Sequence, residues 1–131
     1  MIQERIKITL LKVNRDERGM LSKIFDYAAL EGKKIQDIYL TYTIPGENRA
    51  NHYHKKTTEW FFAIKGEGSI KFKDIATNEE FDVRLDGNDP KLIEVPPGII
   101  HYIFAKGKEE LILIAFGNQP YKNGDTDTYT D

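Results

Sequence analysis

Short apolar runs rich in Ile, Val, Thr, Tyr and Phe alternate with turn residues along most of this chain. We expect strands at Arg5 to Val13, Ile35 to Ile44, Glu59 to Ile64, Ser69 to Lys73, Phe81 to Leu85, Lys91 to Val95, Ile99 to Phe104 and Leu111 to Phe116. The turns between them are Pro45-Gly46, Gly66-Glu67-Gly68, Asp86-Gly87-Asn88 and Pro97-Gly98. This spacing is typical of an all-β sandwich or barrel. We therefore predict a closed or nearly closed antiparallel β-barrel whose cavity accommodates one small ligand.

The sequence also predicts one short helix and a polar C-terminal tail. One short helix is expected from Asp26 to Glu31, because Gly32 follows in the position that favours a helix end. We predict that the polar tail from Lys122 to Asp131 is loosely packed. Alternation within the strands places Trp60, Phe62 and Ile64 on outer faces, together with Tyr53, where they cover a dimer interface or a second sheet.

Composition narrows the classes of function. The chain has 131 residues, the size of one domain, so we expect a single domain over residues 1–131. A net charge of −2, with no basic stripe, argues against a nucleic-acid partner. No apolar run is long enough for a membrane helix or resembles a leader peptide, so a cytoplasmic location and no membrane partner are expected. Without cysteine, any metal site must use nitrogen and oxygen ligands.

The three histidines of the chain are the main candidates for chemistry. His52 and His54 are two residues apart, so their imidazoles share one face of an extended strand. Lys55 to Thr58 reads as a hairpin turn that brings Glu59 alongside on the next strand. His101 follows a rigid Pro-Gly turn. Three imidazoles and one carboxylate meeting inside a barrel would bind a first-row transition metal ion and leave coordination positions open.

These residues also carry a resemblance to the cupin superfamily. The spacing of the first cupin motif is matched by Gly46, His52, His54, Glu59 and Gly66. The core of the second cupin motif is similar to Pro96-Pro97-Gly98-Ile99-Ile100-His101. The sequence departs from the second motif at Ala105, where cupins often have Asn and no metal ligand is required. The resemblance implies an all-β, single-domain cupin, a jelly-roll β-barrel of the dTDP-sugar epimerase type, and a homodimer.

Within the cupins, the region from Tyr42 onward, including the closing DTDTY, resembles the C-terminal domain of capsular polysaccharide-assembling enzymes. Two shorter segments resemble more distant relatives. The segment from Asp16 to Leu21 is similar to one in dTDP-sugar epimerases, and the segment from Arg49 to Lys55 is similar to a motif of the dTDP-sugar 3,4-ketoisomerases. The resemblance implies epimerisation or keto-isomerisation of a nucleotide-activated keto-deoxysugar in cell-surface polysaccharide biosynthesis. Zinc is the expected ion, with nickel, manganese and iron left open. Because the capsule enzymes carry a preceding reductase domain that this sequence does not show, we expect a separate protein for any reduction.

Other candidate catalytic groups would lie on the strand faces that line the cavity. Strand parity places Tyr39, Thr41 and Thr43 on one face, and Tyr39 is the first candidate for carrying protons. Tyr121 matches the aromatic residue of the family's tail, and Arg49 suits a pyrophosphate or carbonyl oxygen. Two other functions stay open: a metal-dependent oxygenase or decarboxylase acting on a small acid, and a sugar-binding or sensing module without catalysis.

Overall fold

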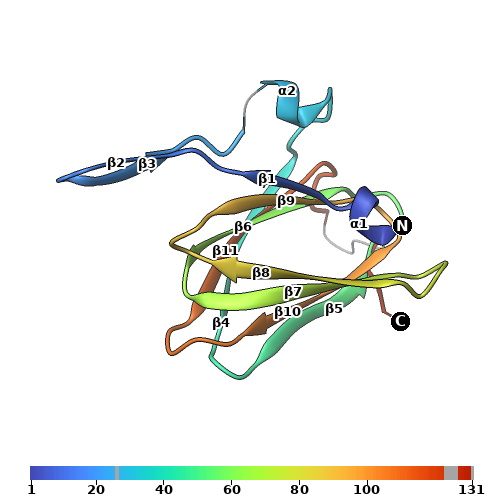
Figure 1. Ribbon diagram of the computed structural model, residues 1–131. Helices are drawn as coiled ribbons and strands as arrows, with labels where there is room; N and C mark the ends of the chain where they lie inside the picture. Colours follow the sequence, from blue (N-terminus) through green and yellow to red (C-terminus); the bar gives the residue numbers. More distant parts are fainter. Residues whose placement is uncertain (26, 123–126, 131) are drawn as a thin grey trace.

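Two five-stranded antiparallel sheets form the body of the protein (Figure 1). The computed structural model describes residues 1–25, 27–122 and 127–130. The first sheet has the order β1-β9-β6-β11-β4, with β1 (Lys7–Leu10), β4 (Asp37–Thr43), β6 (Glu59–Lys65), β9 (Lys91–Val95) and β11 (Leu111–Gly117). The second has the order β12-β5-β10-β7-β8, with β5 (Asn48–Tyr53), β7 (Glu67–Asp74), β8 (Glu80–Asp86), β10 (Ile99–Ala105) and β12 (Tyr129–Thr130).

The core lies between these sheets and contains side chains from both. Strands of the first sheet contribute Phe61, Ile93 and Leu113, and strands of the second contribute Ile70 and Phe72, all at most 1% exposed. The all-β jelly-roll prediction is confirmed. Among the described residues no strand pairing joins the two sheets, so the barrel is open rather than closed.

The N-terminal region differs from the predicted long strand between Arg5 and Val13. It begins with a helical turn, α1 (Ile2–Arg5), because Ile2 is only 2% exposed and packs into the core. The chain then forms β1, breaks, and continues as the hairpin of β2 (Val13–Asp16) and β3 (Gly19–Ser22), which projects from the body in Figure 1. The predicted strand is therefore confirmed over Lys7–Leu10, but its start at Arg5 is wrong because apolar periodicity over a short segment does not distinguish a buried helical turn from a strand.

The second short helix, α2 (Tyr27–Leu30), is close to the prediction, although Asp26 lies outside the described residues. Gly32 has a φ of +80°, as expected for a residue that ends a helix. The segment around this helix covers part of the outer face of the first sheet. Phe25 packs edge-on against Trp60 with ring centroids 5.7 Å apart, so the outward Trp60 is buried by its own chain, while Ile64 remains 48% exposed.

Strand β4 shows the alternation that the sequence predicts. Tyr39, Thr41 and Thr43 are wholly or partly buried, whereas the intervening Ile38 and Leu40 are 63% and 50% exposed. The phenol and hydroxyl groups of this strand therefore face the space between the sheets. This parity brings Tyr39 to the candidate site.

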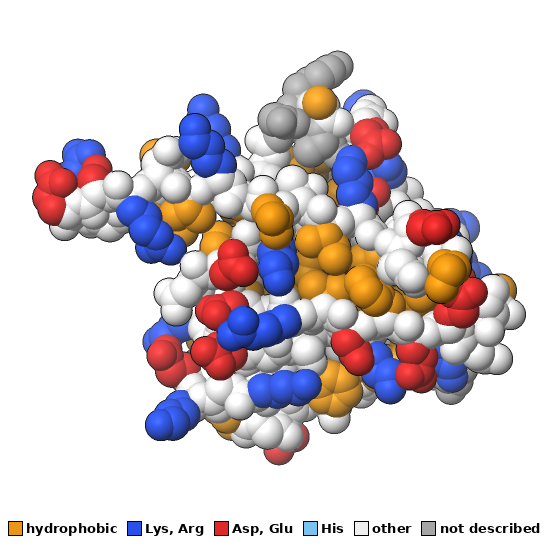
Figure 2. Space-filling model, viewed as in Figure 1, with side chains coloured by type: hydrophobic (Ala, Val, Ile, Leu, Met, Phe, Trp, Pro, Cys, Tyr) orange, Lys and Arg blue, Asp and Glu red, His pale blue; other side chains and the backbone are white. Residues whose placement is uncertain are grey.

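The surface over β7 and β8 carries both signs of charge. Figure 2 shows basic and acidic side chains mixed across this face. The ion pairs on these strands include Lys71 with Glu80 at 3.1 Å and Arg84 with Asp86 at 3.3 Å. Such a mixed face offers no continuous array of cations to phosphates. None of the helices among the described residues has the length and apolar character needed to cross a bilayer.

Candidate metal centre

The candidate site lies between the sheets because the chain changes sheet between β5 and β6. Strand β5 ends at Tyr53 and β6 begins at Glu59, and the turn between them agrees with the prediction. The predicted hairpin, however, is wrong, since β5 pairs with β10 and β12 while β6 pairs with β9 and β11. Glu59 therefore reaches His52 from the opposite sheet.

A bulge in β5 orients the first histidine. His52 pairs with His101 on β10, but the next pair joins Ala50 to Tyr102, so Asn51 is an extra residue. Both Ala50 and Asn51 have positive φ, at 76° and 60°, which L-residues rarely adopt. The carbonyl of Ala50 lies 3.1 Å from His52 Nδ1 and fixes the ring.

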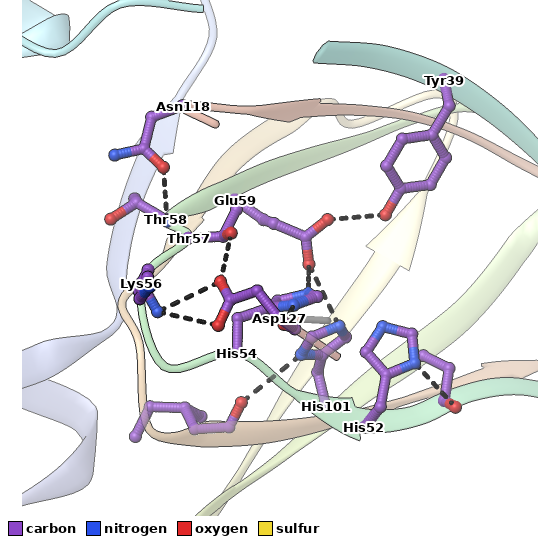
Figure 3. A network of polar contacts seen from close by, with 12 residues as sticks. Tyr39, His52, His54, Lys56, Thr57, Thr58, Glu59, His101, Asn118 and Asp127 are labelled. Atoms are coloured by element: carbon purple, nitrogen blue, oxygen red, sulfur yellow. Dashed lines mark hydrogen bonds and ion pairs between the residues drawn. The ribbon is translucent and has the colours of Figure 1, made fainter. Parts of the chain in front are cut away.

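The four predicted ligands converge at one point. One potential ligand atom from each of His52, His54, Glu59 and His101 lies within 4.8 Å of the other three. Figure 3 shows the imidazoles and the carboxylate directed towards one another. Glu59 Oε1 lies 2.7 Å from His54 Nε2 and 3.3 Å from His101 Nε2. Whether these residues bind an ion stays a prediction, but their side chains meet as the spacing indicated.

The donor set fits a divalent ion of the first transition row. His101 is 1% exposed, and among the described residues its Nε2 has no partner with hydrogen-bond geometry, although Glu59 Oε1 is 3.3 Å away. Buried polar atoms nearly always have a partner, so an unpaired nitrogen facing a carboxylate and two more imidazoles indicates a ligand for a cation. The residues present therefore suit zinc, nickel, manganese or iron.

Burial and mutual charge separate the protonation states within the cluster. Burial alone raises the pKa of Glu59, but the imidazoles of His101 and His54 outweigh it and hold that pKa well below its usual range. Burial lowers the pKa of His52 to about 4, with smaller contributions from His101 and His54. Burial also acts to lower the pKa of His54, but Glu59 prevails and raises it. His52 is therefore neutral at pH 7 and ready to ligate.

Tyr39 extends this network from the first sheet. Its hydroxyl donates a 2.7 Å hydrogen bond to Glu59 Oε2, the carboxylate oxygen that does not face the imidazoles. Burial, and then the charge of Glu59, raise the pKa of Tyr39 far above its usual value. Tyr39 is thus a neutral phenol, which can donate a proton but is poorly suited to remove one.

A cavity of about 840 Å³ opens onto the cluster. Of the predicted site residues, Tyr39, His52, His54, Glu59 and Tyr121 line it, and Tyr121 is 73% exposed at its rim. Arg49 is not among the lining residues; it is exposed, and its Nε donates to the Tyr42 carbonyl at 2.9 Å. The structure therefore does not bring Arg49 to the cavity.

Two residues around the cluster were not identified from the sequence. Asp127 accepts hydrogen bonds from the turn that follows β5, and Asn118 exchanges two with Thr58, at 2.8 and 3.1 Å, beside Glu59 (Figure 3). Asn118 lies 60 residues from Thr58 in sequence, and Asp127 lies 70 and 71 residues from Thr57 and Lys56. The only available signal was the resemblance of the DTDTY segment, whose first two residues lie outside the described part.

Comparison with known proteins agrees with the resemblance seen in the sequence. The model of the family described as "Polysaccharide biosynthesis C-terminal domain" matches residues 14–129. A curated relative, UDP-2-acetamido-2,6-beta-L-arabino-hexul-4-ose reductase of Pseudomonas aeruginosa, is 32% identical over 85 residues. That match covers 65% of this chain but only 23% of the relative, so the chain corresponds to less than a quarter of that protein.

Solved structures show the same fold. The capsular polysaccharide assembling protein CapF from Staphylococcus aureus matches with a TM-score of 0.70 and 23% identity, over 92% of this chain and 34% of that one. The dTDP-6-deoxy-D-glucose-3,5-epimerase RmlC from Legionella pneumophila, solved with dTDP-4-keto-L-rhamnose, matches with a TM-score of 0.83 and 17% identity, over 96% and 72%. The capsule enzymes and the dTDP-sugar epimerases, two of the classes named by the sequence resemblance, are therefore confirmed as structural neighbours.

Proposed function

This chain belongs to the family of polysaccharide biosynthesis C-terminal domains, and on that premise we propose that it is a metal-dependent enzyme acting on a nucleotide-activated keto-deoxysugar. The proposed reaction is epimerisation or keto-isomerisation beside the sugar ketone. The nucleotide-sugar ligand of the epimerase neighbour and the polysaccharide function of the family support this substrate class.

The observation that carries the proposal is the convergence of four potential ligand atoms within 4.8 Å, one of them the buried His101 Nε2, which makes no hydrogen bond to the described residues. His52, His54, Glu59 and His101 would hold the ion. A bound divalent ion would supply Lewis acidity towards the ketone oxygen. Zinc is the first choice because the proposed reaction involves no change of oxidation state.

The proposed chemistry is balanced as a proton shift. A C–H bond beside the ketone breaks and its proton passes to an acceptor in the cavity, while the ketone oxygen becomes an enolate. In epimerisation a proton returns to the same carbon from the opposite face and the ketone re-forms. In keto-isomerisation the proton returns to the former ketone carbon, whose oxygen also gains a proton, and the hydroxyl on the first carbon loses its proton to become the new ketone. Tyr39 would donate rather than accept, because its raised pKa keeps the phenol protonated. Lys56 and Lys122, which line the cavity, offer cations to the diphosphate of the substrate.

Solvent exchange tests this function directly. Zinc-loaded protein would be incubated in D₂O with a UDP- or dTDP-linked 4-keto-6-deoxysugar, and the sugar analysed by mass spectrometry and NMR. The proposal predicts deuterium at a carbon beside the ketone, and loss of this exchange in Glu59→Gln but not in Glu110→Gln, which changes an exposed carboxylate. No deuterium with either nucleotide would contradict the proposal.

A second candidate is the same proton shift without an ion. It is favoured by the contrast between His52, whose pKa burial lowers to about 4, and His54, whose pKa Glu59 raises, since two neighbouring groups with pKa values shifted in opposite directions suit a base and an acid. Their ring centroids are 5.1 Å apart. Full deuterium exchange by chelator-treated, metal-free protein would favour this candidate over the metal-dependent one.

A further inference from the structure

We propose that Asp127 is a positioning residue for the metal centre, fastening residues 127–130 to the turn that carries His54 and so setting which imidazole nitrogen of His54 faces the cavity. This inference rests on the proposed metal-dependent function and assigns to it a residue outside the ligand set.

The carboxylate of Asp127 binds three consecutive residues of the turn. Its Oδ1 accepts from the backbone N–H of Lys55 at 3.0 Å and of Lys56 at 3.2 Å, and its Oδ2 accepts from Lys56 at 3.1 Å and from the Thr57 hydroxyl at 2.7 Å. One side chain thereby satisfies three donors of the turn between β5 and β6. Figure 3 shows this carboxylate between the turn and the imidazole cluster.

The backbone carbonyl of Asp127 contacts His54, one of the proposed metal ligands. His54 Nδ1 lies 2.6 Å from the carbonyl oxygen of Asp127, an acceptor, so this nitrogen carries a hydrogen that it donates. The opposite nitrogen, Nε2, is left to face Glu59 at 2.7 Å. A carbonyl on one imidazole nitrogen fixes the tautomer and the ring plane of a metal-ligating histidine.

His54 depends on this distant contact in a way that the other two histidines do not. His52 Nδ1 lies 3.1 Å from the carbonyl of Ala50, and His101 Nδ1 lies 3.4 Å from that of Ile99, in each case two residues earlier on the same strand. The corresponding carbonyl for His54 is 73 residues away in sequence. Local strand geometry therefore orients two of the imidazoles, whereas the C-terminal segment orients the third.

The segment is anchored at further points. In β12, Tyr129 pairs with Tyr53 and stacks on its ring with centroids 5.5 Å apart, and Thr130 pairs with His52. The ammonium group of Lys55 lies 4.1 Å from the centre of the Tyr129 ring. The expectation that residues 122–131 pack loosely is therefore wrong for the described residues 127–130.

The test compares Asp127→Ala and Asp127→Asn with Asp89→Ala, which removes an exposed carboxylate from the turn after β8. Hydrogen exchange at the Lys55 and Lys56 amides is measured in metal-free protein. Zinc affinity is measured by chelator competition, and the visible spectrum of the Co²⁺-loaded protein reports the ligand geometry. We expect Asp127→Ala to accelerate both amides, to weaken zinc binding by about 10- to 100-fold and to alter the Co²⁺ bands.

Asp127→Asn should show a smaller loss, because its amide oxygen still accepts from the turn, and Asp89→Ala should match the wild type. The Asn variant also provides the comparison if Asp127→Ala fails to fold. Unchanged zinc affinity and Co²⁺ spectrum in the Asp127 variants would overturn the inference while leaving the metal site intact. Absence of zinc and cobalt binding in the wild type would instead overturn the proposed function, and the inference with it.

Discussion

The hydroxyl of Tyr39 and the carboxylate of Glu59 form a 2.7 Å hydrogen bond that joins β4 to β6 on the cavity side of the first sheet. The bond occupies Oε2, so that Oε1 is the oxygen presented to His54. Tyr39 thus has two separable roles: it orients Glu59, a candidate metal ligand, and it places a neutral phenol at the cavity, where it can donate a proton.

Replacing Tyr39 by Phe distinguishes the orienting role from the proton-donating role. We expect Tyr39→Phe to weaken zinc affinity by about 10-fold, because Glu59 loses an orienting donor. At saturating zinc we expect deuterium exchange of the sugar to slow by about 100-fold, because a proton donor is lost. Chelator competition and mass spectrometry measure the two effects. Equal exchange rates for variant and wild type at saturating zinc would show that Tyr39 only orients Glu59.

Replacing Glu59 by Gln keeps its size and removes its charge. We expect Glu59→Gln to weaken zinc binding by at least about 10-fold, since an amide is a poorer ligand for a transition metal than a carboxylate. Circular dichroism should show the same β-sheet content as the wild type. Elemental analysis of the variant, with Glu110→Gln as the control, checks the loss. An unchanged metal content would remove Glu59 from the ligand set.

The zinc affinity should depend on pH through His54 rather than His52. Glu59 raises the pKa of His54 in the metal-free protein, so a proton competes with the ion for this imidazole once the pH falls below that raised value. His52, with a pKa of about 4, stays deprotonated above about pH 5 and adds no competition there. Chelator competition between about pH 5 and 8 should therefore show affinity falling as the pH is lowered. A pH-independent affinity would contradict this account.

The two glycines of the first motif should respond differently to alanine. Gly66 has a φ of +86°, and a Cβ there would clash with the carbonyl of Glu110, whereas Gly46, at +88°, has open space around it. Gly46→Ala should cost about 1 to 2 kcal/mol in free energy of unfolding, from backbone conformation alone. Gly66→Ala should cost about 3 kcal/mol or more, because strand β11 must also move. Urea unfolding of metal-free protein distinguishes them, and equal costs would contradict the packing argument.

The sequence predicted the parts of this fold that depend on local pattern. Apolar alternation located the core strands, and its parity placed Tyr39 on the cavity side. The candidate ligand set could be proposed from the sequence because the spacing of His52, His54 and Glu59 forms a local motif around one turn. His101 joined it through the Pro-Gly turn that precedes its strand.

The remaining features depend on pairing over long distances. Periodicity shows which face of a strand is buried but not which strand lies beside it, so the change of sheet between β5 and β6 was taken for a hairpin. For the same reason the sequence did not indicate the contacts of Asp127, whose partners lie 70 to 73 residues earlier in the chain. Arg49 was placed by resemblance alone, and the positive φ of its neighbour Ala50 lies in a bulge that no alternation reveals.

Elemental analysis of the purified wild-type chain, dialysed against metal-free buffer and then supplied with zinc, tests the central claim most directly. The arrangement of His52, His54, Glu59 and His101 predicts about one tightly held divalent ion per chain. Zinc would agree with the proposed proton shift, whereas resident iron would favour the oxygenase alternative. A wild-type protein that retains no ion after zinc has been supplied would contradict the claim that these four side chains form a metal centre.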